Sequence, residues 1–588
     1  MRRYWVVALA VLTLLGVLSP PVWAQAPAAP TPKVTITGLV DNLVNFSRNM
    51  SQFDLATGGI TNPDDDHMYA RTRGRFDVIG ELGKAKAVLG LEIDLAYGQV
   101  AGADNSDSGF ITPQTFGTSG GFDANTDVLS VIEIKWMYVE FPFSGPGSLL
   151  PFIPWAGTMT VGGQPYALGL KPSILADSDF GGGTVRMKLS PTLGFSLTYA
   201  QLEEDYAGHQ QSTAAATGRF GRGDDWGLIL KADWQATKEL RVSPIYAFQE
   251  LEGTTSGAVR RAVGGYGVGV ANFAPDLAVG APGVVTPCLG AGGSGVQCRS
   301  VEEQRHWIGV DARWASGPWY VAPTAFYQFG QRERFVAPGD PGVGTTAANA
   351  GATIRRKTAN ISAWIADVEA GYRMGPLFLQ TRAMYTSGNK TADNLNEEIR
   401  YYQPFQVDST YFFGWGEGVP LSSIDYFQGV YTPVGAYFMG NNISYDRYGR
   451  AGFAVKATYD WTPQLSVYGS VAPWWTARSV PTDNGAITAA GIACNTTGDA
   501  QTSTLFPCTR RDEGNASFLG TDLAAGFTWR FAPGLTFDWV YGILVAGSAY
   551  DTNRFATFTN AAAGQAGTFR KFDAENVYTT TARVRYTF

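Results

Sequence analysis

Charged residues are scarce in this chain of 588 residues, and they include no excess of basic ones. Asp, Glu, Lys and Arg together make up 16% of the sequence, whereas about a quarter is usual for soluble domains. The formal net charge is −7. A nucleic-acid binder needs a concentrated basic surface to displace counterions from phosphates, so we expect no nucleic-acid partner.

Histidine is scarcer still, with three residues in the whole chain. His67, His209 and His306 are far apart in the sequence and form no visible ligand set. No Ser/His/Asp arrangement is legible, and we expect His67 and His209 in external loops. The sequence therefore predicts no metal site, no cofactor and no catalytic residues.

Long hydrophobic runs are absent beyond residue 24, since no later stretch is uniformly apolar over the ~20 residues that a helical span needs. At the N-terminus, two arginines precede an apolar segment at 6–18, and Val22-Trp23-Ala24 fits signal-peptidase cleavage after Ala24. An uncleaved membrane anchor is the alternative for this segment. The expected organisation is a signal peptide at 1–24, a Pro/Ala-rich spacer at 25–33 and a single exported domain at 34–588.

Aromatic residues and glycine are abundant instead. Phe, Trp and Tyr reach 13% of the sequence, and there are 71 glycines. The mean hydropathy is nevertheless only −0.07. This combination suits a barrel with an apolar outside and a polar inside whose strands are joined by turns.

Apolar residues alternate with polar or small ones along most of the exported domain, most clearly from Tyr69 to Tyr97. A period of two predicts β-strands. The segments run well over ten residues, whereas strands of soluble proteins average ~5–6 and a tilted strand needs ~9–11 to cross a membrane. We therefore predict an all-β fold, a transmembrane antiparallel up-and-down β-barrel.

Very short connections alternate with long ones along the domain. Gly83-Lys84 is a short turn, for example, and residues 50–66 form a long loop. Bacterial barrels have short periplasmic turns and long extracellular loops, so the sequence predicts the outer membrane of a Gram-negative bacterium. Pairing each long loop with a short turn gives about 18 strands; sixteen is the alternative, because residues 142–193 are irregular.

Several motifs resemble those of the Gram-negative general porins. The final amphipathic strand ends on Phe588, residues 34–41 look like the first porin strand, and residues 71–76 resemble the second porin hairpin. Gly162 to Tyr166 looks like the approach to the loop that folds into the pore. The resemblance implies contact with outer-membrane lipid and lipopolysaccharide, recognition of Phe588 by the barrel-assembly machinery, and a homotrimer.

The charges that line the lumen decide what a channel passes. Arg71, Arg73 and Arg75 share one face of a strand, and facing lipid each would cost about 2–4 kcal/mol. We expect them to form a positive ladder in the lumen; a strand end above the membrane is the alternative. The other expected pore-lining residues are Asp77, Glu81, Lys84, Lys86, Glu92, Asp94, Arg583 and Arg585.

A constriction loop is expected after the fifth strand, between Pro165 and Gly183. Its candidate residues are Tyr166, Lys171, Asp177 and Asp179, whose acids would face the basic ladder. An ordinary external loop is the alternative. A second stretch, 389–446, is rich in aromatic residues that are unlikely to lie free in water. It predicts either a stacking surface for solutes or a large lid packed on itself.

The four cysteines fall into two local pairs, each in a segment rich in small residues. An exported chain can form disulfides, so we predict Cys288–Cys298 and Cys494–Cys508 as staples of two loop tips.

The function predicted is passive diffusion of small hydrophilic solutes and ions through a water-filled lumen with a mixed-charge constriction. A channel selective for sugars, organic acids or anions is the main alternative. A barrel enzyme is a minor one.

Overall fold

The computed structural model describes residues 31–48, 66–97, 132–168, 171, 174–203, 225–253, 301–336, 355–390, 393, 397–407, 448–480, 516–550, 552–556, 568–572 and 575–588. The expected signal peptide at 1–24 and the four cysteines lie outside these ranges, as does His209. Within them, no helix is long and apolar enough to cross a membrane.

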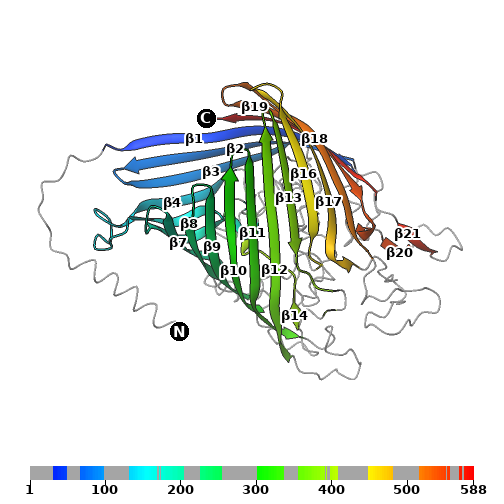
Figure 1. Ribbon diagram of the computed structural model, residues 1–588, viewed down its shortest axis with the longest axis horizontal. Helices are drawn as coiled ribbons and strands as arrows, with labels where there is room; N and C mark the ends of the chain where they lie inside the picture. The colour runs from blue at the N-terminus through cyan, green and yellow to red at the C-terminus, as the bar shows by residue number, and fades with distance from the viewer. Residues whose placement is uncertain are drawn as a thin grey trace, which may run out of the picture.

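Nearly all of the described chain is β-structure (Figure 1). The first half contains β1 (Lys33–Arg48), β2 (Asp66–Leu82), β3 (Ala85–Tyr97), β4 (Ile132–Ser144), β5 (Gly157–Ala167), β6 (Ala176–Lys188), β7 (Leu193–Glu203), β8 (Asp225–Gln235) and β9 (Leu240–Gly253). The second half contains β10 (Val301–Ser316), β11 (Trp319–Val336), β12 (Arg355–Met374), β13 (Leu377–Thr386), β14 (Glu398–Ile399), β15 (Gln406–Val407), β16 (Ala451–Asp460), β17 (Leu465–Val480), β18 (Ala516–Ala532), β19 (Leu535–Ala546), β20 (Thr552–Ala556), β21 (Thr568–Phe572) and β22 (Val577–Thr587), with a 3-10 turn at Ser548–Tyr550.

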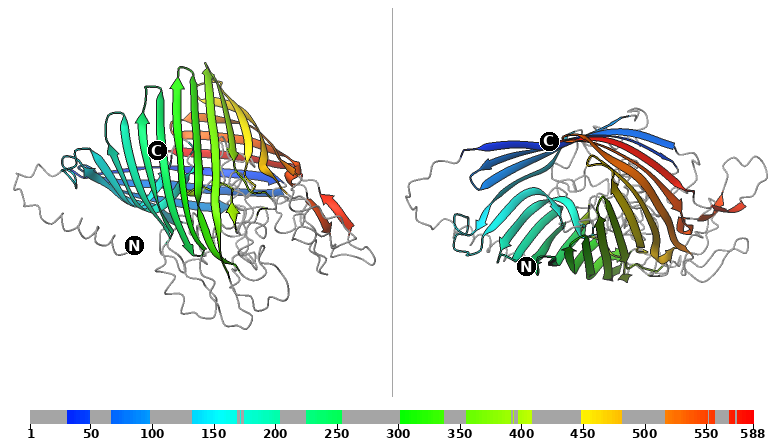
Figure 2. Two further views of the ribbon diagram at one scale, coloured as in Figure 1. Left: turned by 60° about the horizontal axis from the view of Figure 1, so that its bottom comes forward. Right: turned by 45° about the horizontal axis from the view of Figure 1, so that its top comes forward.

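Eighteen of these strands form one closed antiparallel wall. The main sheet has 20 strands, of which β14 and β15 are two-residue strands that join it by parallel pairs. The other eighteen pair with their neighbours along the chain, and β22 pairs with β1 to close the ring. The backbone N–H groups of Gly38 and Phe588 each donate to the other residue's carbonyl at 3.0 Å. β1 and β22 lie side by side in Figures 1 and 2. The strand pairings thus confirm the prediction of eighteen strands.

The wall is apolar outside. Alternate residues of its strands are exposed apolar side chains, such as Leu523 and Trp529 on β18 and Tyr541 and Val545 on β19. Aromatic side chains of adjacent strands meet near the strand ends, as Trp319 does with Tyr372 at 4.3 Å between ring centroids. In water such a surface would be costly, whereas in a bilayer it is the expected band with aromatic girdles.

The connections fall into two classes that alternate along the chain. The turns predicted at Gly83-Lys84 and around Gly317, Gly375 and Gly534 each join adjacent strands, and all four glycines have a positive φ. The segment between β4 and β5 is longer than these turns and contains a bridge between Ser144 and Leu150, which explains the irregular pattern seen in the sequence. The short segments between β6 and β7, between β8 and β9 and between β16 and β17 lie at the same end of the wall as these turns, and the connections that alternate with them lie at the other end.

Candidate pore constriction

The β5–β6 hairpin leaves the wall partway along its length. β4 pairs with β5 only as far as Gly163, and β7 pairs with β6 only from Gly181. The two strands of the hairpin nevertheless stay paired to Ala167 and Asp177. Residues 164–168, 171 and 174–180, the hairpin tip, therefore have no wall strand beside them in the described part of the chain.

Glycine makes this departure possible. Gly162 has φ 124° and Gly182 has φ 150°, a backbone region that side chains rarely adopt. A Cβ at Gly162 would also lie 2.4 Å from the Met137 carbonyl oxygen, and one at Gly182 would lie 2.0 Å from the Tyr199 carbonyl oxygen. The two glycines face each other in the register, so both strands bend at one level.

A second stretch, the crossing segment 397–407, lies inside the barrel beside the tip. Its first strand, β14, pairs with β12, and its second strand, β15, pairs with β6 of the tip. Tyr402 donates its hydroxyl to the Ile174 carbonyl at 2.7 Å, and the Phe405 amide donates to the Leu175 carbonyl at 2.7 Å. Tip and crossing segment thus form one hydrogen-bonded unit across the lumen.

The crossing segment is also bonded to the wall at β10 and β11. Trp307 donates its indole N–H to the Gln403 carbonyl at 3.0 Å, and Gln328 donates to the same carbonyl at 2.7 Å. The Phe405 ring lies 5.8 Å from Trp307 and 6.4 Å from Phe180 of the tip. Tyr402 and Phe405 are fully buried, so the aromatic-rich stretch folds into the lumen here and packs on the tip; its residues 408–447 lie outside the described ranges.

The inner wall beneath this unit is apolar, which the sequence analysis missed. Ile229, Ile245, Ile361 and Ile365 point inward and are buried. On β12 the inward positions 359, 361, 363 and 365 are thus Ala, Ile, Ala and Ile, while the outward neighbours Asn360 and Ser362 are polar. An apolar row on the inward face, where an open lumen requires polar residues, is the sequence signal for a covered stretch of wall.

The predicted arginines of β2 face inward and bind carboxylates. Arg73 lies 2.9 Å from a Glu92 carboxylate oxygen on β3, and Arg75 donates its Nε–H to the other oxygen. Both arginines therefore share one acid. The register places Arg71 and Asp94 on the same face, but their side chains lie outside the described part.

Lys135 joins this group from β4, and the sequence analysis did not identify it. It lies at a register irregularity opposite Gly90 and Leu91, where an extra residue breaks the alternation. Its Nζ lies 3.6 Å from Glu92 and 3.2 Å from Asp179 of the tip. The predicted constriction residue Asp179 thus lies close to the predicted ladder; Asp177 lies two residues away on the same strand.

The remaining predicted residues divide between wall and rim. Arg585 binds Asp41 at 2.7 Å, and Arg583 binds Asp538 at 3.0 Å. Asp77 accepts a hydrogen bond from the Trp136 indole, Lys86 pairs with Glu140, and Glu81 pairs with Lys33. Lys84 is a correction, because it lies in the turn between β2 and β3 at the rim and not on the wall.

Lys171 of the tip reaches the other side of the lumen. Its Nζ lies 2.5 Å from Asp367 Oδ1 and donates to the Ala322 carbonyl at 2.6 Å. Arg382 of β13 binds the second oxygen of Asp367 at 2.7 Å. All three charged side chains are buried. Burial lowers the pKa of Lys171 and the Asp367 charge opposes that shift.

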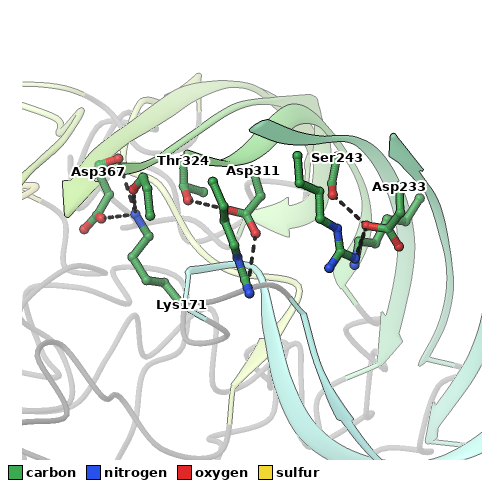
Figure 3. Close-up of polar contacts among 10 residues, drawn as sticks. Lys171, Asp233, Ser243, Asp311, Thr324 and Asp367 are labelled. Atoms are coloured by element: carbon green, nitrogen blue, oxygen red, sulfur yellow. Dashed lines mark hydrogen bonds and ion pairs between the residues drawn. The ribbon is translucent and has the colours of Figure 1, made fainter. Parts of the chain in front are cut away.

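Asp367 belongs to a polar row along neighbouring strands of the wall (Figure 3). Thr324 of β11 lies opposite both Asp311 of β10 and Asp367 of β12, and it donates to Asp311 at 3.0 Å. Ser243 of β9 lies opposite Asp311 and donates to Asp233 at 2.6 Å. In a ring of eighteen strands, β10 and β11 lie diametrically opposite β1 and β2. The row carries cations beside its acids: Arg241 and Lys231 lie 2.6 and 3.2 Å from Asp233, Arg313 lies 3.8 Å from Asp311, and Arg382 lies 2.7 Å from Asp367. This row of mixed charge faces the arginines of β2 across the lumen.

The His306 side chain does not lie in the lumen group. His306 is on the outer face of β10, where its ring stacks on Phe329 at 4.9 Å and its Nδ1 lies 2.8 Å from the Tyr246 hydroxyl. His67 is a correction, since it lies within β2 and pairs with Ser47, not in a loop.

A closed ring of this size decides the architecture. Barrels of sixteen to eighteen strands leave an aqueous lumen, and a closed wall with an apolar outside satisfies every strand edge within lipid. The chain is an outer-membrane β-barrel with a porin-type fold. Such barrels span the outer membrane of Gram-negative bacteria, which is where the barrel belongs.

Solved structures of Pseudomonas aeruginosa outer-membrane proteins align with this barrel over nearly its whole length. OccK9 (OpdG) shows 9% identity and a TM-score of 0.41, covering 94% of this chain and 98% of its own. OccK11 (OpdR) shows 9% identity and a TM-score of 0.39, with coverages of 94% and 96%. OpdK, solved with vanillate, shows 8% identity and a TM-score of 0.36, with coverages of 94% and 98%. No protein-family model and no curated protein matches the sequence.

Proposed function

We propose that the barrel is a diffusion channel for small hydrophilic solutes and ions, narrowed where the hairpin tip and the crossing segment span the lumen. The observation that carries this proposal is the pairing of β15 with β6, together with Lys171 on Asp367. An open lumen of eighteen strands would be wide. Two inward segments bonded to each other and to opposite walls leave a smaller path.

A substrate-selective channel is the second candidate. The unit formed by the hairpin tip and the crossing segment favours it over a general pore. Charges of both signs border this unit: Glu92 with Arg73 and Arg75 and Asp179 with Lys135 lie on one side, and the row of mixed charge lies opposite. Such an arrangement orients a dipolar or charged solute and admits few others. The proposal is for solute passage with selection by size and charge, without a chemical reaction.

Planar-bilayer recordings of the purified barrel test both candidates. A stable ohmic conductance is the expected result for a diffusion channel. Saturable block of the ionic current by one class of sugar, organic acid or anion supports the selective channel, and the absence of any block supports the general pore. A barrel without conductance would overturn the proposal, and hydrolysis of an ester or peptide would favour an enzyme instead.

We also propose that residues 1–24 are a signal peptide, that 25–33 form a spacer before the barrel, and that the barrel assembles as a homotrimer with lipid and lipopolysaccharide around it. The apolar outer wall supports the lipid contacts. N-terminal sequencing of the exported protein and cross-linking in detergent test the cleavage site and the trimer.

A further inference from the structure

Lys171 is held in an unusual way for a lysine on a hairpin tip. An ammonium group has three N–H donors, and the acceptors around this one are Asp367 Oδ1 at 2.5 Å, the Ala322 carbonyl at 2.6 Å and the Asp367 carbonyl at 3.5 Å. The lysine therefore has its acceptors on the facing wall strands β11 and β12.

The tip is held at two ends. At its base, Gly162 and Gly182 let both strands bend, and Lys135 holds Asp179. At the far end, Lys171 binds Asp367 of β12. Between them, Tyr402 and Phe405 bind the tip to the crossing segment.

We infer that Lys171 sets the size limit of the pore by pinning the hairpin tip to Asp367 on β12. This inference deepens the proposed channel function and rests on it. With the pin in place, the tip lies across the lumen. Without it, the tip keeps its bonds to the crossing segment but loses its tie to β12, so its Lys171 end can move away from that wall and the path there widens.

The wall is built so that loss of the pin leaves no isolated charge behind. Removing one partner of a buried ion pair is costly because the other charge is left uncompensated. Here Arg382 binds the second oxygen of Asp367 at 2.7 Å. Lys171→Met therefore removes the tie between the tip and β12 while Asp367 stays paired, whereas Asp367→Asn would leave both cations without their carboxylate.

A matched control exists on β8. Lys231 lies 3.2 Å from Asp233, and Arg241 binds the same carboxylate oxygen at 2.6 Å. Lys231→Met thus also removes a lysine from a Lys–Asp–Arg group, but this lysine is part of the wall itself. Its loss changes the charge as Lys171→Met does and frees no inward segment.

The test is single-channel conductance and size exclusion of neutral polymers for the wild-type protein, K171M and K231M. We expect K171M to raise the conductance about twofold and to admit larger polymers, since both follow pore width, while K231M keeps the wild-type size limit. An unchanged size limit in K171M, or an equal change in K231M, overturns the inference.

Hydrogen–deuterium exchange of the same three proteins is the second readout and needs no current. The amides of Leu168 and Phe405 are hydrogen-bonded to the tip carbonyls of Ala176 and Leu175. In K171M, peptides covering residues 164–180 should exchange faster than in K231M; equal rates overturn the inference. A silent wild-type channel whose K171M form still exchanges faster would refute the channel function and leave the pin standing.

Discussion

Glu92 holds the basic side of the lumen together. Its two carboxylate oxygens contact Arg73 and Arg75, and Lys135 lies within 3.6 Å. Three cations around one buried acid leave the group with a net positive charge. Of the two arginines, Arg75 is the more exposed, with 28% of its side chain accessible against 4% for Arg73. Arg75 is thus the better placed to meet a passing ion.

Arg75→Gln is expected to shift the channel toward cations. Glu92 keeps two cationic neighbours in this variant, so the wall should still assemble while one positive charge leaves the lumen. A change of about twofold in the ratio of cation to anion permeability is expected, measured as the reversal potential in a salt gradient. Lys84→Gln removes the same charge at the rim and serves as the control; equal shifts in both variants would place Arg75 away from the narrow part.

At the scale of single elements, the β5–β6 hairpin depends on its two glycines. Gly182→Val would put a side chain against the Tyr199 carbonyl oxygen, where a Cβ would lie 2.0 Å away, and would force an unfavourable φ. Strain of this kind costs of order 1–3 kcal/mol. We expect a lower denaturant midpoint for barrels refolded in lipid vesicles, followed by tryptophan fluorescence.

Gly183→Ala is the control for that experiment. A Cβ there meets Met159 Cε and the Thr160 carbonyl oxygen at 3.7 Å, which is ordinary contact, and its φ is not positive. If both variants lowered the denaturant midpoint equally, the specific need for glycine at residue 182 would be refuted.

The strands themselves follow from the sequence because lipid and water impose opposite demands on alternate residues. β22 shows this clearly, with Val584 and Tyr586 outside and Arg583 and Arg585 inside. The same rule fails on β12, where Ile361 and Ile365 face inward under the crossing segment. The apolar inward row marks a covered stretch of wall, but no local pattern identifies what covers it, since the cover comes from residues 397–407.

The candidate site was predicted unevenly for the same reason. Tyr166 and Lys171 were singled out from a porin-like motif, and the tip that carries them does fold inward. Their partners were missed. Asp367 lies where β12 alternates regularly, so nothing local distinguishes it from other inward acids, and Lys135 lies at a β-bulge, where counting by two fails. Long-range pairs across a lumen leave no trace in the spacing of either partner.

At the scale of the whole molecule, the bilayer sets the stability of the wall. Leu523 faces lipid on β18, and the next residue, Ala524, faces the lumen by alternation. Leu523→Arg should lower the free energy of unfolding in vesicles by about 2–4 kcal/mol if residue 523 lies near mid-bilayer. Ala524→Arg should lower it far less, because its guanidinium stays hydrated. Equal losses would contradict the assignment of the outer face.

The two loop disulfides remain a prediction. Peptide mapping of the exported protein without reduction should recover Cys288 linked to Cys298 and Cys494 linked to Cys508. Free thiols, or links between the two pairs, would refute the local pairing.

The bonds between Gly38 and Phe588 join the first strand to the last, so the barrel can close only after the whole chain has been made. Arg585 and Asp41, 544 positions apart in the sequence, become neighbours only when β22 pairs with β1. Until then, one edge of β1 has no partner strand. A product truncated before β22 would have two unpaired strand edges, and each could pair with a strand of another polypeptide. Shortened versions of this protein should therefore be cleared by proteolysis or aggregate, and never persist as narrower pores.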